Sequence, residues 1–182
     1  SDRAGPASHR AVLAATWGRQ DGLECTLKER NKRAVLGRLS HDRPEAGTSS
    51  FTRQQWPRGL GHAVWCAREL VGREPFALLL PDVLVQNKPG CLKQMIDAYN
   101  AAGQSANIVA VEEVPMDRIS AYGVVGVVDA KGKMFAITEM VEKPAPEKAQ
   151  SNLIITGRYI IQPEIQKTGG LSEGKKISDL AQ

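Results

Sequence analysis

Two short stretches of this sequence carry residues whose types and spacing could bind a phosphate ester. In the first, residues 54–65, two adjacent amides precede a glycine-bearing turn and the start of a helix. In the second, the apolar run 76–80 ends on Pro81 and Asp82. Helix N-termini bind anions through unpaired N–H groups, and open α/β sheets place ligands at the carboxyl ends of strands. The pattern is therefore typical of a nucleotide site.

The amide pair contains a candidate for reading a pyrimidine base. A glutamine amide presents one donor and one acceptor, which can match the adjacent N–H and C=O groups of uracil or thymine. A nearby glycine lets main-chain groups approach the ring. Gln55 and Gly59 have this spacing. A surface glutamine and a turn glycine are the ordinary alternative, and we prefer that interpretation for Gln54 alone.

Three further charged residues could handle phosphates and a sugar. A Mg²⁺ ion takes one or two carboxylates together with phosphate oxygens and water, so the strand-end Asp82 is a sufficient start for a metal site. Glu142 could accept hydrogen bonds from vicinal hydroxyls, while Lys143 could place a positive charge at a phosphate. An ordinary exposed Glu-Lys pair before a proline is the alternative.

The sequence shows no Ser/His/Asp or Cys/His arrangement for nucleophilic catalysis. A transfer reaction at phosphorus in which the attacking phosphate oxygen is already ionised does not need one. Positioning and electrostatic stabilisation would supply most of the rate. His62 stands in the first turn of a predicted helix without a catalytic partner, so we predict that it caps or packs that helix.

Five segments occur in the order and approximate spacing found in the bacterial UTP–glucose-1-phosphate uridylyltransferases, which are sugar nucleotidyltransferases. The chain resembles that family from about Leu23 to its end. The matching segments are residues 54–64 (QQWPRGLGHAV), 80–82 (LPD), 121–125 (AYGVV), 141–144 (VEKP) and 151–159 (SNLIITGRY). Each motif is weak by itself, whereas the conjunction of all five is specific.

The resemblance implies synthesis of UDP-glucose and pyrophosphate from UTP and glucose 1-phosphate, with Mg²⁺ as cofactor. It also implies a role for each matching residue. The nucleotide-binding residues are Gln55 and Gly59; the catalytic residues are Asp82 and Lys143; the sugar-binding residues are Tyr122, Gly123, Glu142 and Gly157; and the metal ligands are Asp82 and Asp179. A tyrosine at position 122 could equally belong to the core, and Asp179 could equally cap a helix.

The family begins with a Gly-x-Gly-Thr-Arg loop that binds the triphosphate, and residues 1–23 contain nothing similar. We therefore expect a chain that is incomplete at its N-terminus. The alternative function is a catalytically inactive domain that binds a nucleotide sugar, or a structural or oligomerising module. A glycosyltransferase is less favoured because Asp82 lacks the second aspartate of an Asp-x-Asp motif. Missing elements would expose an apolar face, so we expect a homo-oligomer.

Composition limits the possible classes of protein. The chain has 182 residues, of which 42% are hydrophobic and 24% charged, as in a globular domain with a real core. A net charge of +4 without a block of like charges predicts anionic small molecules as ligands and no nucleic acid. No apolar run is long enough to cross a membrane. Three cysteines without a C-x-x-C spacing indicate a reducing cytoplasm.

Hydrophobic periodicity predicts the elements that must position these residues. We expect a loose leader over residues 1–22 and a nucleotidyltransferase-like domain over 23–182. The expected fold is α/β, a Rossmann-like mixed sheet flanked by helices, with a small antiparallel flap. The predicted helices are 23–39, one that follows Gly61, 91–102, 163–168 and 177–182. The predicted strands are 48–54, a central buried strand 76–80, 107–111, a hairpin of 124–128 with 134–138, and 153–161.

Overall fold

A five-stranded sheet forms the centre of the computed structural model, which describes residues 28–35, 37, 49–128 and 132–167. The strands are β1 (Phe76–Leu79), β2 (Ile108–Glu113), β3 (Gly123–Val127), β4 (Ile137–Glu142) and β5 (Leu153–Ile161). The α-helices of the body are α3 (Leu60–Cys66), α4 (Arg68–Val71) and α5 (Cys91–Ala101). Three 3₁₀ turns, η1 (Met116–Ala121), η2 (Pro146–Lys148) and η3 (Pro163–Lys167), connect them. The predicted α/β class is confirmed.

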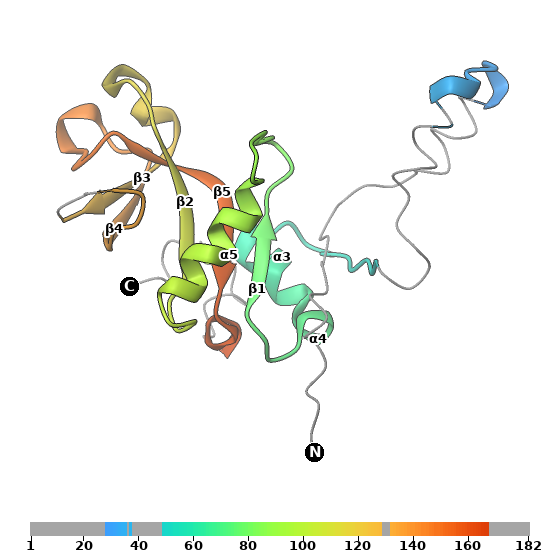
Figure 1. The fold of residues 1–182 in the computed structure, drawn as a ribbon, viewed down its shortest axis with the longest axis horizontal. Coiled ribbons are helices and arrows are strands. Elements are labelled where there is room, and N and C mark those ends of the chain that lie inside the picture. Colours follow the sequence, from blue (N-terminus) through green and yellow to red (C-terminus); the bar gives the residue numbers. More distant parts are fainter. Residues whose placement is uncertain (1–27, 36, 38–48, 129–131, 168–182) are drawn as a thin grey trace.

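β5 connects the whole sheet (Figure 1). Its sequence LIITGRYII is rich in β-branched and aromatic residues, which favour a strand, and its bounds are those predicted from the sequence. Near its end β5 lies between β1 and β2, with Tyr159 opposite both Leu78 and Val109. Near its start Ile154 lies opposite Val124 of β3. All pairings among the described strands are antiparallel, so β1 and β2 run in the same direction on either side of β5.

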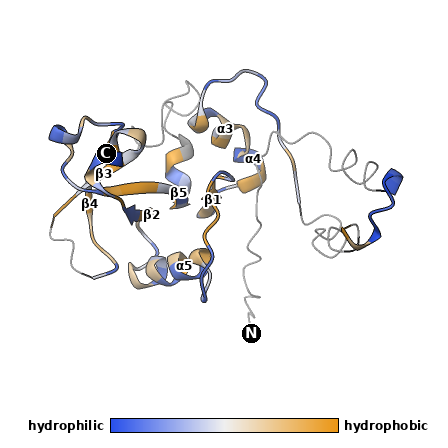
Figure 2. Ribbon diagram, turned by 90° about the horizontal axis from the view of Figure 1, so that it is seen from above, coloured by the Kyte–Doolittle hydropathy of each residue, from blue (hydrophilic) through white to orange (hydrophobic). Residues whose placement is uncertain are grey.

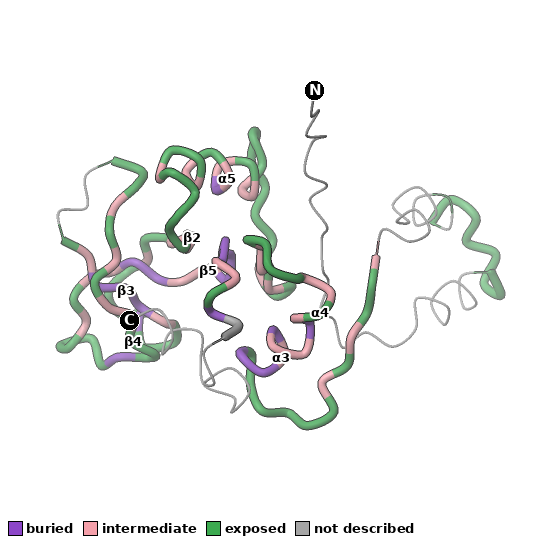
Figure 3. The backbone as a smooth tube through the Cα atoms, turned by 90° about the horizontal axis from the view of Figure 1, so that it is seen from below, coloured by how far each residue is buried: buried purple, intermediate pink, exposed green. Residues whose placement is uncertain are grey.

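Helices cover both faces of this sheet (Figure 2). On one face Val64 of α3 packs with Tyr159, Ile161 and Ile165. On the other face lies α5, whose Met95 is buried. Burial therefore concentrates on β5 and on the helix sides that face it (Figure 3).

A second cluster of buried side chains fixes the other end of the sheet. Ile119 of η1 packs there with Val124 and Ile154, and Ile119 is fully buried. The predicted hairpin of β3 and β4 is present, with Gly123 opposite Glu142. β4 begins three residues later than predicted, at Ile137, and Met134 remains outside the strand, half exposed. This shift carries Glu142 into the strand, directly opposite β3.

Three predictions of secondary structure were wrong. The expected central strand at 76–80 is β1, which pairs only with β5 among the described strands and leaves Leu79 41% exposed. Residues 49–54 form no strand; instead the Thr52 hydroxyl donates to the carbonyl of Cys66, 3.2 Å away. The helix expected at 23–39 is interrupted in its described part at Asn31, whose φ is 52°. A left-handed residue ends helical hydrogen bonding.

The described residues of 28–37 are exposed where their burial is known, and they lie apart from the sheet (Figure 1). Without a surface to pack against, an amphipathic pattern alone does not hold a long helix. The predicted leader at 1–22 and the predicted helix at 177–182 lie outside the described residues. No helix of the described chain is long and apolar enough to cross a membrane.

We expect Gly157→Ala to destabilise the fold more than Gly72→Ala does. Both glycines have a positive φ, 72° and 74° respectively, a conformation that alanine adopts only with backbone strain, about 1–3 kcal/mol at either position. Only at position 157 would the added β-carbon lie 3.0 Å from the Leu80 side chain, whereas nothing lies within 4 Å at position 72. Overpacking should add about 1–3 kcal/mol there. Urea unfolding of the two variants measures the difference, and equal losses would contradict this role of the Leu80 contact.

Candidate functional site

The turn that carries Asp82 is fixed to β5 by main-chain and side-chain hydrogen bonds. The Leu80 amide donates to the Gly157 carbonyl over 2.9 Å. The Arg158 guanidinium donates to the carbonyls of Leu80 and Val83, on either side of Asp82. Asp82 itself is exposed. The predicted metal ligand therefore projects from a fixed turn at the carboxyl end of β1.

The predicted sugar-binding and catalytic residues of β3 and β4 lie together. Gly123 stands opposite Glu142, and a β-carbon at position 123 would lie 3.5 Å from the Glu142 Oε2 atom. The Lys143 amide donates to the Tyr122 carbonyl over 2.9 Å. Lys143 has a φ of 50°, a conformation that residues other than glycine adopt rarely and often at functional sites. The edge of the β3–β4 hairpin thus gathers four predicted residues.

Tyr122 belongs to this edge and not to the core, because its side chain is 42% exposed. The core alternative considered for Tyr122 is therefore wrong. Its carbonyl fixes Lys143, while its ring remains accessible to a ligand.

The two groups of residues approach each other across β5. Gly157 contacts Leu80, and Ile155, two residues earlier on the same strand, contacts Gly123. Two residues of a strand span about 7 Å. Desolvation by burial raises the pKa of Tyr159 above 10.0, and the charges of Glu142 and Asp82 raise it further. Both carboxylates are thus close enough to act on the same phenol, so the Asp82 turn and the Glu142 edge border one region.

Tyr159 and Arg158 are the residues of this region to which our sequence reasoning gave no definite role. Both are 8% exposed, in a strand whose other side chains are mainly apolar. Their signal in the sequence was the presence of two polar side chains within a long apolar strand, since a buried polar group requires a partner.

The loop of the amide pair is held by Gln54. Its Nε2 atom donates to the Gly59 carbonyl over 3.0 Å and lies 2.8 Å from the Nδ1 atom of His62. Gly59 has a φ of 91° and precedes the first residue of α3. Gln54 was predicted to be a surface glutamine without a special role, and this was wrong, because its amide fixes the turn.

The packing role predicted for His62 is confirmed, since its ring is 8% exposed and stacks on Trp65 with the centroids 5.8 Å apart. Trp56, in contrast, is 66% exposed. Gln55 is exposed, and its side chain forms no hydrogen bond within the described residues. Its donor and acceptor are therefore available to a ligand.

The structure does not join every predicted site residue. In the described part of the chain, no hydrogen bond or ion pair connects Gln55 or Gly59 with Asp82 or Glu142. The loop reaches the same core through α3, since Val64 packs against Tyr159. Asp179, the second predicted metal ligand, lies outside the described residues.

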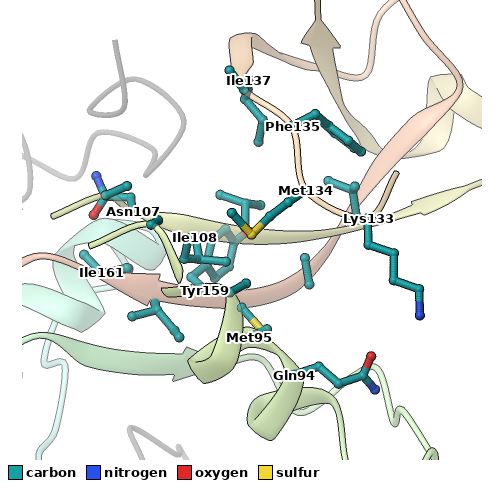
Figure 4. A pocket seen from close by; sticks show the side chains of 18 of the residues that line it. Gln94, Met95, Asn107, Ile108, Lys133, Met134, Phe135, Ile137, Tyr159 and Ile161 are labelled. Atoms are coloured by element: carbon teal, nitrogen blue, oxygen red, sulfur yellow. The ribbon is translucent and has the colours of Figure 1, made fainter. Parts of the chain in front are cut away.

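A cavity of about 920 Å³ lies between α5, β2 and residues 133–140, and Tyr159 is part of its lining (Figure 4). Its walls are mostly apolar and include Met95, Ile108 and Met134. None of the predicted site residues lines it. Convergent polar groups mark a binding site better than volume does, and such groups lie at the Asp82 turn and the Glu142 edge.

The described residues contain no cluster of three or more His, Cys, Asp or Glu side chains that could hold a metal ion by itself. Mg²⁺ commonly binds through one or two carboxylates and completes its shell with substrate phosphates and water. The exposed carboxylate of Asp82 fits such a shared site.

Comparison with known proteins identifies close relatives. The nucleotidyl transferase family matches residues 24–180. The UTP–glucose-1-phosphate uridylyltransferase of Komagataeibacter xylinus is 41% identical over 145 residues, which are 80% of this chain and 50% of that protein. The enzyme of the same name from Bacillus subtilis is 40% identical over 143 residues, which are 79% of this chain and 48% of that protein. The chain thus spans about half the length of these curated relatives.

Solved structures of proteins with related names are also similar to this chain. The UTP-bound UGPase from Acinetobacter baumannii is 35% identical with a TM-score of 0.71, covering 90% of this chain and 58% of that one. A UDP-glucose pyrophosphorylase complexed with UDP-glucose is 33% identical with a TM-score of 0.69, covering 93% of this chain and 66% of that one. At these identities, the likeness extends from the fold to the sequence.

We expect Tyr159→Phe to flatten the loss of stability at alkaline pH. The pKa of Tyr159 is raised in the folded chain, so the unfolded chain loses this proton first as the pH rises. The wild-type free energy of unfolding should therefore fall from about pH 10 upward until the folded pKa is reached. Urea unfolding between pH 8 and 11 measures this slope. Tyr122→Phe, at an exposed tyrosine, should keep the wild-type slope; an unchanged slope in Tyr159→Phe would contradict the assignment.

Proposed function

Because the chain belongs to the nucleotidyl transferase family, we propose that it transfers a uridylyl group from UTP to glucose 1-phosphate, giving UDP-glucose and pyrophosphate. Relatives at 35–41% identity carry the name of this activity. The observation that supports the proposal best is the edge where Gly123, Glu142 and Lys143 meet, beside the turn of Asp82.

In the proposed reaction, a phosphate oxygen of glucose 1-phosphate attacks the α-phosphorus of UTP. The bond from that phosphorus to the bridging oxygen breaks, and pyrophosphate leaves with the electron pair. No proton has to be removed from the nucleophile, so the residues must position the reactants and balance their charge.

Each residue of the edge has a defined part in the proposal. The Glu142 carboxylate accepts hydrogen bonds from vicinal hydroxyls of the sugar, and Lys143 places its ammonium group at the phosphate. Gly123 lets the sugar approach the main chain beside Glu142, and Tyr122 forms a wall of the site. Gly157 has a sugar-binding role in the proposal, although its lack of a side chain is already required by Leu80.

The base is read by the loop before α3. Gln55 supplies the donor and acceptor for uracil, and Gly59 brings main-chain groups close to the ring. Gln54 and His62 hold this loop in one conformation, so binding of the base should require little rearrangement of the loop.

We assign Asp82 and Asp179 as the residues that hold Mg²⁺. When bound, the ion neutralises charge on the phosphates under attack. Asp82 fits this role because its carboxylate is exposed and forms no ion pair within the described residues.

We also propose that the protein works in the cytoplasm as a homo-oligomer. Cys66 and Cys91 are free thiols, in keeping with a reducing compartment. Large apolar side chains such as Leu84 and Val128, 89% and 69% exposed, support association with a second copy.

The activity is tested by incubating the chain with UTP, glucose 1-phosphate and Mg²⁺ and following the release of pyrophosphate. Release that depends on all three supports the proposal. If no pyrophosphate appears while UDP-glucose still raises the melting temperature, the chain is an inactive domain that binds a nucleotide sugar. If UDP-glucose has no effect either, both functions are excluded.

We expect Asp82→Asn to lower the rate of pyrophosphate release by about ten-fold or more, because an amide is a poorer ligand for Mg²⁺ than a carboxylate. The Mg²⁺ concentration that gives half the maximal rate should rise as well. Asp97→Asn is the matched control, since Asp97 is an exposed residue of α5 with an ion pair to Lys93. Unchanged Mg²⁺ dependence in Asp82→Asn would count against the assigned ligand.

Substitutions of the two adjacent glutamines should affect different properties, UTP binding in one case and the stability of the fold in the other. Gln55→Ala should weaken UTP binding about ten-fold and leave the melting temperature unchanged, because its exposed amide bonds only to the ligand. Gln54→Ala should lower the free energy of unfolding by about 1 kcal/mol, because it removes the hydrogen bonds to Gly59 and His62. Calorimetric titration and urea unfolding measure the two effects. The reverse pattern would exchange the roles of the two residues.

A further inference from the structure

Arg158 is a buried cation without an ion-pair partner in the described chain. Its side chain lies in β5 with 8% exposure. Its guanidinium donates to three main-chain carbonyls, those of Leu80, Val83 and Gly157, the last over 3.2 Å. Burial of a charge costs several kcal/mol unless hydrogen bonds compensate for it. Here the compensation comes entirely from the protein backbone.

Two of these carbonyls enclose the functional turn. Leu80 precedes Pro81 and Asp82, and Val83 follows them. One planar guanidinium therefore holds both ends of the two-residue segment that contains the acidic residue. The planar fork of an arginine fixes two acceptors in a set direction, whereas a lysine ammonium is a point charge without this geometry.

The same turn has a third attachment to β5. The Leu80 amide donates to the Gly157 carbonyl, and the Leu80 side chain lies against the α-carbon of Gly157. Leu80 is thus held at both its amide and its carbonyl, whereas the segment after Asp82 is held by Arg158 through Val83. The backbone on both sides of Asp82 is therefore attached to β5.

We propose that Arg158 is a positioning residue that fixes the Asp82 carboxylate in the direction required for metal-linked nucleotide binding. The inference rests on the proposed function insofar as that function assigns Asp82 to the metal. Arg158 does not bind the phosphates itself, because its bonded N–H groups point to the backbone of the turn and its side chain is buried, whereas Asp82 is exposed. It acts through Asp82.

The experiment measures the affinity of the chain for UTP by calorimetric titration, with and without Mg²⁺. The ratio of the two affinities reports how well the metal is held, and a purely structural role would not change this ratio selectively. Arg158→Lys keeps the charge and loses the fork. Arg158→Gln loses the charge but keeps donors for one carbonyl, and it serves as a second variant should the first fail to fold. Arg118→Lys, at an exposed arginine of η1, is the control.

We expect both Arg158 variants to lower the Mg²⁺ enhancement of UTP affinity by about ten-fold, the equivalent of one charge-assisted interaction, with little change in affinity without Mg²⁺. In a chain that already carries Asp82→Asn, adding Arg158→Lys should change the enhancement by less than about two-fold, since residues that act through one another are not additive. Arg118→Lys should behave as the wild type does.

Three results would overturn the inference. The first is a wild-type enhancement in both folded Arg158 variants. The second is an equal loss of UTP affinity with and without Mg²⁺, which would indicate a direct phosphate contact or a general loosening. The third is a full additional loss in the Asp82→Asn background. Pyrophosphate release by the wild-type chain is followed separately, so a failure of the proposed activity is distinguishable from a failure of this inference.

Discussion

The close contact between Leu80 and Gly157 is the constraint on which the rest of the site depends. A strand residue with a side chain at position 157 would keep β1 and the turn after it away from β5. With glycine, the Leu80 amide reaches the Gly157 carbonyl and the following residues turn over Arg158. The position of Asp82 is thus determined by an absent side chain on a neighbouring strand, about 75 residues away in the sequence.

β5 also positions the other part of the site, the edge of the β3–β4 hairpin. Ile155 supports Gly123 from the same strand, and Gly123 leaves room for the Glu142 carboxylate on its cross-strand side. Lys143 follows in a left-handed conformation, which is stabilised by the hydrogen bond that its main-chain N–H donates to the Tyr122 carbonyl. A change in β5 would therefore move the acidic turn and the hairpin edge together.

The sequence predicted those elements whose residues have a strong intrinsic preference for one secondary structure. The run 153–161 is long, apolar and β-branched, and its bounds agreed with the structure. The place of each strand relative to its neighbours in the sheet could not be predicted in the same way. The apolar run at β1 indicated a strand buried on both faces, yet among the described strands it has a single partner. Residues 49–54 have strand-like composition, but their polar groups bond to α3 instead. An amphipathic pattern likewise predicted a helix through Asn31, but the helix is interrupted there and the described residues around it are exposed.

Among the site residues, too, local sequence patterns were predictable, whereas contacts between distant segments were not. Motif spacing identified the Glu142 edge, because two adjacent strands bring neighbouring motifs together through local pairing. It could not show that Gln54 fixes the turn, since this role rests on the contacts of its amide with Gly59 and His62. Arg158 and Tyr159 were missed as partners of Asp82 because their role depends on which strand lies beside β5.

The charges of the region explain why a cation belongs to the proposed chemistry. Asp82 and Glu142 both raise the pKa of Tyr159, and within the described chain neither forms an ion pair. A triphosphate entering this region adds further negative charge. Like charges repel one another more strongly where water is partly excluded. Of the cations described in this region, Arg158 is bonded to backbone carbonyls, whereas Lys143 remains available to a ligand. One ammonium group cannot neutralise two carboxylates and a triphosphate. A divalent ion shared between Asp82 and the phosphates turns the carboxylate from a repulsive group into a ligand, which is why positioning of that carboxylate is central to the function we propose.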